Sequence, residues 1–63
     1  MSQIVIYKGI TVTPIDRSGG KIKVRTHNAA DAQKAGLPFK EMSGANAVFE
    51  DWVPESELVP IDP

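Results

Sequence analysis

Basic side chains recur at every second position along one short segment and begin beside the turn that precedes it. These residues are Arg17, Lys21, Lys23, Arg25 and His27. Alternate side chains of an extended strand share one face, so this basic ladder would present its cations in a row. Such a row suits a phosphate backbone, and Tyr7 or Trp52 could offer a nucleic-acid base a stacking surface. The ladder therefore predicts one candidate function, nucleic-acid binding.

The same ladder has a second interpretation that needs no ligand. An exposed strand face in a soluble protein requires charged side chains, and lysines also discourage edge-to-edge aggregation of strands. The whole chain is slightly acidic, with a net charge of −1 and a pI of about 5.6. Nucleic-acid-binding domains usually carry a basic footprint. We therefore keep nucleic-acid binding as the alternative hypothesis.

Enzyme chemistry has few residues to use. His27 is the only histidine and there is no cysteine, so no Cys-His pair can form. Glu50 and Asp51 are neighbours on an expected strand, where adjacent side chains point to opposite faces and cannot act as a carboxylate pair. The serines lie in expected turns without a nucleophile-elbow pattern, and no spacing provides three metal ligands. We predict that the chain is not an enzyme and has neither a cofactor nor a metal site.

Charge is divided sharply along the chain. Residues 1–40 hold seven basic and two acidic residues, a net charge of +5, whereas residues 41–63 hold six acidic and no basic residues, a net charge of −6. One interpretation is that acidic and basic strands lie side by side and neutralise each other. The other is a polar molecule with a basic face for one partner and an acidic face for another. We favour the first.

Two hairpins are predicted in the basic part of the chain. Residues 4–7 and 10–13 flank a Lys-Gly pair, the spacing of a two-residue hairpin turn. Their core side chains would be Val5, Tyr7, Ile10 and Val12. Ile4 and Ile6 would then face outward. Proline has no N–H for the sheet, so a bulge is expected after residue 13, which would turn Ile15 inward.

The second hairpin turns at a Ser-Gly-Gly sequence, and its return strand alternates polar and apolar residues over 21–26, placing Ile22 and Val24 in the core. A short inserted helix is predicted at about residues 28–36, with Asn28 as N-cap and a glycine at its end. The helix would be anchored to the sheet by Leu37 and Phe39.

The acidic part of the chain is expected to complete the sheet. Residues 42–46 are small and polar and predict a loop, followed by a fourth strand over 48–53. A 3₁₀ turn over 55–58 and a last strand over 59–61 would close the fold.

The residues from Trp52 to Val59, Trp-Val-Pro-Glu-Ser-Glu-Leu-Val, resemble the closing segment of Src-homology-3-like barrels. In that family the fourth strand ends in a glycine, an aromatic residue or leucine, an aliphatic residue and a proline. One 3₁₀ turn and a short last strand follow. The resemblance implies an all-β fold, a small, partly open five-stranded barrel with one inserted helix. The length of the chain predicts a single domain spanning residues 1–63.

The chain departs from the ligand-binding members of this family. Where those carry a tyrosine in the 3₁₀ turn, this chain has Glu57, and it lacks the Ala-Leu-Tyr-Asp-Tyr stretch and the second tryptophan of the peptide groove. Recognition of proline-rich peptides, which needs an aromatic groove, is therefore not expected. Stand-alone barrels of this kind, in bacteria and their phages, often serve as adaptors, inhibitors or assembly components. The resemblance implies a role of that type.

A second candidate surface surrounds Trp52, because a partly exposed tryptophan is a frequent anchor for protein partners. If Val53 and Phe49 face the core, the alternate residues of the same strand face outward. In the other interpretation Trp52 merely covers the inserted helix. The expected partner-binding residues are Trp52, Val48, Glu50, Glu55 and Glu57, joined by Ile4 and Ile6 as an apolar patch.

Size sets the last constraint. A chain of 63 residues buries only about 60% of its unfolded surface, so its core is marginal and a partner or self-association would help. Its first apolar run, Ile4 to Tyr7, is too short for a signal peptide or a membrane span, and we expect a cytoplasmic protein. The predicted function is a non-enzymatic protein-interaction module that binds a protein partner or forms a homo-oligomer.

Overall fold

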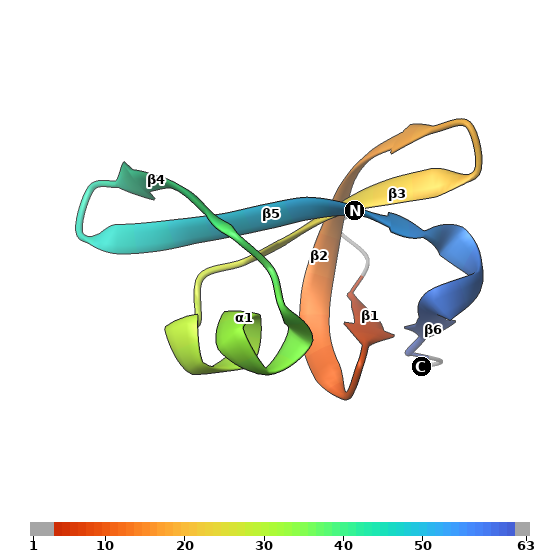
Figure 1. Ribbon diagram of the computed structural model, residues 1–63, viewed down its shortest axis with the longest axis horizontal. Helices are drawn as coiled ribbons and strands as arrows, with labels where there is room; N and C mark the ends of the chain where they lie inside the picture. The colour runs from red at the N-terminus through yellow and green to blue at the C-terminus, as the bar shows by residue number, and fades with distance from the viewer. Residues whose placement is uncertain (1–3, 62–63) are drawn as a thin grey trace.

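The computed structural model describes residues 4–61, which form one sheet of six antiparallel strands, a short α-helix and a 3₁₀ turn (Figure 1). The elements are β1 (Val5–Tyr7), β2 (Ile10–Ser18), β3 (Lys21–Thr26), α1 (Ala29–Ala35), β4 (Phe39–Ser43), β5 (Asn46–Pro54), η1 (Glu55–Glu57) and β6 (Leu58–Pro60). The strand order across the sheet is β4-β5-β3-β2-β1-β6. The predicted all-β class with one short helix is confirmed, with six strands in place of five.

The first hairpin has the predicted register. Val5 pairs with Val12 and Tyr7 pairs with Ile10, and all four side chains are buried. The turn between β1 and β2 holds its two central residues at positive φ, 50° for Lys8 and 85° for Gly9. This is the backbone of a two-residue hairpin turn whose twist matches that of the flanking strands.

Strand β2 serves both halves of the sheet, pairing with β1 along its first part and with β3 along its second. The register shifts between Pro14 and Asp16, as the missing proline N–H predicts. The expectation that Ile15 turns inward is wrong, because its side chain is exposed. Pro14 takes the inward position opposite Val24, and Ile15 is the extra, unpaired residue of the bulge.

The expected loop at residues 42–46 is the turn of a further hairpin. Strand β4 pairs with β5 from Phe39 to Ser43, and Ser43 faces Asn46 across the turn. All five residues of β4 are exposed, so no inward-outward alternation of apolar side chains marks this strand in the sequence. Phe39 is therefore not a buried anchor of the helix. It lies exposed at the sheet edge, edge-on to Phe49 with ring centroids 5.8 Å apart.

Helix α1 forms where the sequence predicts it. The Asn28 side-chain oxygen accepts a hydrogen bond from the Asp31 N–H at 3.0 Å, and Gly36 ends the helix at a φ of 77°. Ala32 and Ala35 are buried against the sheet, and Leu37, directly after the helix, is buried with them. The helix thereby covers one end of the interior, beside the β1–β2 turn.

The interior is filled mainly by branched aliphatic side chains. Its buried members are Val5, Tyr7, Ile10, Val12, Ile22, Val24, Ala32, Ala35, Leu37 and Val53, with Phe49 and Leu58 packed against them. Turn η1 lies at the other end of the molecule from α1 (Figure 1) and is tied to the β2–β3 turn by the Glu55 N–H, which donates to the Gly20 carbonyl at 3.1 Å. The two ends of the interior are thus covered by different elements.

Candidate functional site

The outer face of β5 holds three residues that the sequence places in contact with a partner. Val48, Glu50 and Trp52 do face away from the interior, because Val53 and Phe49 pack into it. Val48 is nevertheless buried, and the Glu50 side chain is only 3% exposed. The expectation that Val48 and Glu50 are available to a partner is therefore wrong.

Three cations bury Glu50. Arg25 donates from Nε to one Glu50 oxygen at 2.6 Å, and the Nζ atoms of Lys23 and Lys40 lie 3.5 Å and 3.6 Å from the other oxygen. Arg25 sits directly opposite Glu50 in the β3–β5 register. Burial raises the pKa of Glu50, but the Arg25 hydrogen bond and the charges of Arg25, Lys23 and Lys40 outweigh it and hold the pKa below its ordinary value of 4.5.

This cluster changes the interpretation of the basic ladder. Lys23 and Arg25 share a face as predicted, but they are engaged with Glu50. Lys21 is exposed on that face, and His27 has its Nδ1 3.1 Å from the Ala47 carbonyl oxygen. Lys40 was not predicted to take part, because its strand was not recognised. The acidic and basic strands lie side by side and neutralise each other here, as the favoured interpretation of the charge division expects.

Trp52 lies on the outer face beside this cluster. It stands opposite Lys23, whose Nζ is 5.9 Å from the indole ring centroid, and 37% of the residue is exposed. Helix α1 packs its alanines with Val53 on the other face of β5. Trp52 therefore does not cover the inserted helix, and it remains accessible at the surface.

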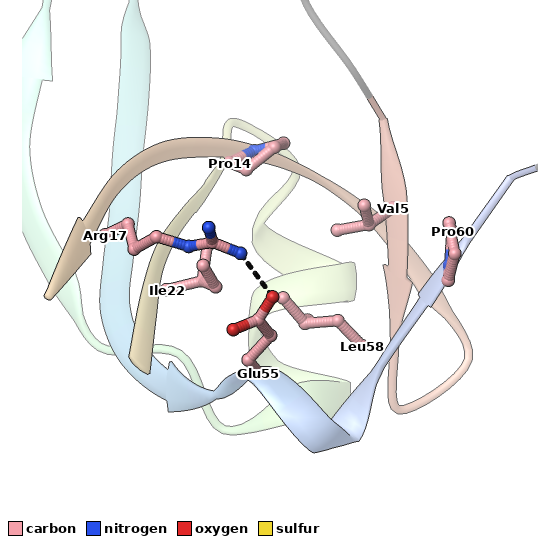
Figure 2. Close-up of a pocket in the computed structure, with 7 residues that line it drawn as sticks. All are labelled: Val5, Pro14, Arg17, Ile22, Glu55, Leu58 and Pro60. Atoms are coloured by element: carbon pink, nitrogen blue, oxygen red, sulfur yellow. Dashed lines mark hydrogen bonds and ion pairs between the residues drawn. The ribbon is translucent and has the colours of Figure 1, made fainter. Parts of the chain in front are cut away.

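Arg17 belongs to a different surface from the rest of the ladder. It pairs with Ile22 in the β2–β3 register, so it faces the interior side of the sheet, and its guanidinium forms an ion pair with Glu55 of η1. The two side chains are 67% and 50% exposed. Figure 2 shows this pair among the side chains that line a pocket. The pocket has a volume of about 290 Å³. The pocket is lined by Val5, Pro14, Arg17, Ile22, Glu55, Leu58 and Pro60.

A third surface lies on the outer side of β1 and β6. Ile6 pairs with Val59, and the same antiparallel register places Ile4 opposite Ile61. Ile4 is 50%, Val59 59% and Ile61 46% exposed, and Ile6 is half-buried. We call Ile4, Ile6, Val59 and Ile61 the aliphatic face. The predicted outward patch of Ile4 and Ile6 thus includes two further residues, Val59 and Ile61. Their alternation with Leu58 and Pro60 is the sequence signal that could have identified them.

Strand β6 is an edge of the sheet, but its backbone offers little to a further strand. Pro60 has no N–H, and the Leu58 N–H already donates to the Glu55 carbonyl. Proline on an edge strand is a recognised protection against strand addition. A partner on this side would therefore contact the side chains of the aliphatic face.

Comparison of the chain with protein-family models, with curated proteins and with solved structures finds no match in any of the three. Within residues 4–61, no three His, Asp or Glu side chains gather as a group that could hold a metal ion. Neither helical segment in that range has the length and apolar character needed to cross a membrane.

Proposed function

We propose that this protein is a non-enzymatic protein-interaction module that binds a protein partner through the aliphatic face. The observation that carries the proposal is the gathering of four aliphatic side chains on one side of β1 and β6, three of them about half exposed. None of the four is charged in a chain with 24% charged residues. Contiguous exposed apolar patches are a recognised mark of interaction sites, unlike apolar residues scattered singly over a surface.

The energy available at this face is sufficient for a specific contact. Fully burying a valine or isoleucine side chain contributes about 1.5–3 kcal/mol, so covering the exposed half of Ile4, Val59 and Ile61 contributes roughly 3 kcal/mol in total. That is the scale of a small hot-spot cluster at a protein interface. Trp52, exposed on β5 opposite Lys23 of β3, would not be covered by the same contact.

The arrangement of the strands supports a Src-homology-3-like barrel as the framework. Strand β2 is shared between a β6-β1-β2 group and a β2-β3-β5 group, and a 3₁₀ turn joins β5 to β6. The additional strand β4 is an insertion relative to the expected five strands. On this framework we propose a cytoplasmic adaptor, inhibitor or assembly component of bacterial or phage type.

Nucleic-acid binding through Arg17, Lys21, Lys23, Arg25 and His27 has less support from the contacts. Glu50 engages Lys23 and Arg25, and Arg17 faces another surface with Glu55. Lys23 and Arg25 are therefore partly neutralised, and Arg17 does not lie on the same face as the other cations. Salt-sensitive amide shifts confined to β3 on titration with oligonucleotides would favour this alternative over a protein partner.

The test replaces one residue of the aliphatic face by a charge. Val59→Asp places a carboxylate in the face opposite Ile6, and Met42→Asp is the matched control, a similarly exposed apolar residue on the opposite sheet edge. The tagged proteins are compared as bait in cell extract, and their own mass is measured by sedimentation. We expect Val59→Asp to lose a specific captured protein or a dimer that the wild type and Met42→Asp retain. Identical captured proteins and identical mass for all three would refute the proposal.

A further inference from the structure

The pocket beneath Arg17 and Glu55 is an opening in the interior of the fold. Its apolar walls come from inward-facing positions: Val5 pairs with both Val12 and Pro60, and Pro14 pairs with Val24. Helix α1 covers the other end of the interior, whereas this end is bordered by turn η1, whose Glu55 meets Arg17 at the rim of the pocket (Figure 2). The mouths of small β-barrels are common ligand sites.

The volume of the pocket limits what can enter. Pockets for small-molecule ligands usually measure about 300–1,000 Å³, and this one, at about 290 Å³, lies at the bottom of that range. It is too small for a nucleotide or another large cofactor, and its aliphatic and proline walls favour a compact apolar group. A single leucine-sized or phenylalanine-sized side chain fits this description.

The rim defines the polar part of the ligand. Arg17 contributes one guanidinium nitrogen, Nη2, to one oxygen of Glu55, Oε2, and within residues 4–61 this is the pair's sole side-chain hydrogen bond. Arg17 therefore keeps donors at Nε and Nη1, and Glu55 keeps an acceptor at Oε1. The net charge of the rim is zero. A ligand that presents one acceptor and one donor, and no charge, satisfies both groups without separating the pair.

We propose that this pocket binds one apolar side chain from the interior of a peptide segment. The groups on either side of that residue are then neutral peptide bonds, and not a charged chain terminus. The side chain packs between Val5, Ile22 and Leu58, a peptide carbonyl accepts from Arg17, and a peptide N–H donates to Glu55. This proposal rests on the proposed function, because it names the chemistry of a segment that a protein partner would contribute. It adds a contact on the side of β1 and β6 opposite the aliphatic face.

The two charged side chains at the rim let the pocket distinguish ligands by their charge, which a purely apolar cavity would not do. An exposed ion pair contributes only about 0–1 kcal/mol, so Arg17 and Glu55 do not close the pocket permanently. A ligand carboxylate near Arg17 would be repelled by Glu55, and a ligand ammonium near Glu55 would be repelled by Arg17. Removing one member of the pair should therefore make the site prefer a ligand whose charge is opposite to that of the member that remains.

The experiment uses three small probes that share one leucine side chain. N-acetyl-leucinamide is neutral, N-acetyl-leucine carries a carboxylate, and leucinamide carries an ammonium at about pH 6.5. Each is titrated into isotope-labelled wild-type protein while the methyl and amide shifts of the pocket residues are followed. We expect saturable shifts at Val5, Ile22 and Leu58 with a dissociation constant on the order of 1 mM for the neutral probe, and several-fold weaker binding of both charged probes.

Two variants test the role of the rim and one serves as control. In Glu55→Ala the unpaired Arg17 should make N-acetyl-leucine the tightest of the three probes, and in Arg17→Ala leucinamide should take that place. Glu57→Ala removes a carboxylate from the same turn but not from the pocket, and it should keep the wild-type order. All three positions are exposed, so the fold is retained in each variant and is checked by its amide spectrum.

The proposal is overturned by any of three results. These are the absence of saturable shifts at the pocket, equal binding of neutral and charged probes by the wild type, and an order of probes that is unchanged in Glu55→Ala. The outcome is separable from that of the proposed function. Probe binding without any effect of Val59→Asp on capture or mass would uphold the pocket and refute the aliphatic face, and the reverse pattern would do the opposite.

Discussion

Glu50 offers the most informative test of how this sheet is held together. The change Glu50→Gln removes the negative charge and leaves the shape of the side chain nearly unchanged. In the folded protein the three cations around it, Lys23, Arg25 and Lys40, then lose their shared counter-charge. Because the three come from β3 and β4 and Glu50 comes from β5, the change weakens contacts among all three strands.

The magnitude follows from the contacts. A hydrogen bond between charged groups contributes about 1.5–3 kcal/mol, and the partly exposed Arg25 places its bond near the lower limit. The two longer lysine contacts resemble surface pairs, at about 0.5 kcal/mol each. Glutamine restores a neutral hydrogen bond of about 0.5 kcal/mol, so the net loss is about 2 kcal/mol. For a domain of this size that is a large fraction of the free energy of unfolding.

The stabilisation that Glu50 provides should depend on pH, and the direction follows from its pKa. The folded-state pKa of Glu50 is lowered, so its contribution is fully present above the unfolded value near 4.5 and is lost as the pH falls through the folded pKa. The difference in stability between wild type and Glu50→Gln should therefore be about 2 kcal/mol at pH 7 and should shrink on acidification below pH 4.5.

The assay is urea unfolding at a series of pH values, followed by the fluorescence of Trp52, which lies beside the cluster. Glu57→Gln is the control, since Glu57 is exposed in η1 and should change stability by less than about 0.5 kcal/mol. Two results would refute the role of Glu50 in holding these strands together. One is a loss of stability below about 0.5 kcal/mol in Glu50→Gln, and the other is a stability difference from wild type that stays constant down to low pH.

Three further changes test the core and the helix ends, each measured as a shift in the urea midpoint at neutral pH. Val24→Ala, at a position with no exposed surface, should cost about 2–3 kcal/mol through the cavity it leaves; a cost below 1 kcal/mol would mean that the interior collapses around it. Asn28→Ala should cost about 1 kcal/mol because the Asp31 N–H loses its acceptor, whereas Asn28→Ser should recover most of it. Gly36→Ala should cost about 1–2 kcal/mol, since its φ of 77° disfavours any residue with a Cβ; an unchanged midpoint would contradict that backbone conformation.

Local patterns in the sequence were enough to predict the parts of the fold that depend on neighbouring residues. The pairing of Val5 with Val12, the bulge beside Pro14 and the helix begun by Asn28 are each specified within a few positions. Strand β4 was missed because an edge strand with both faces exposed carries no apolar alternation. Ile15 was misplaced because the number of residues that a bulge leaves unpaired does not follow from the presence of a proline.

The candidate sites depended on contacts that sequence spacing does not reveal. Alternation correctly placed Glu50 on the outer face, but an outer face is not always an exposed one. Lys40 reaches Glu50 from a strand that had not been recognised. The pairing of Arg17 with Glu55, 38 positions away, depends on how β2 passes the bulge. Ile4 and Ile6 were predicted as an outward patch, and Val59 and Ile61 join them through the β1–β6 pairing.

The pairing of β1 with β6 has a consequence for how the chain acquires its fold during synthesis. Strand β1 can pair with β2 as soon as both are made, but its other edge gains its neighbour only when residues 58–60 have emerged from the ribosome. Until then one side of Val5 and Tyr7 lacks the covering that Leu58 and Pro60 provide. Contacts between distant segments slow folding and prolong the exposure of apolar surface. Until β6 is paired, the growing chain should therefore expose apolar surface of β1 that the finished fold covers.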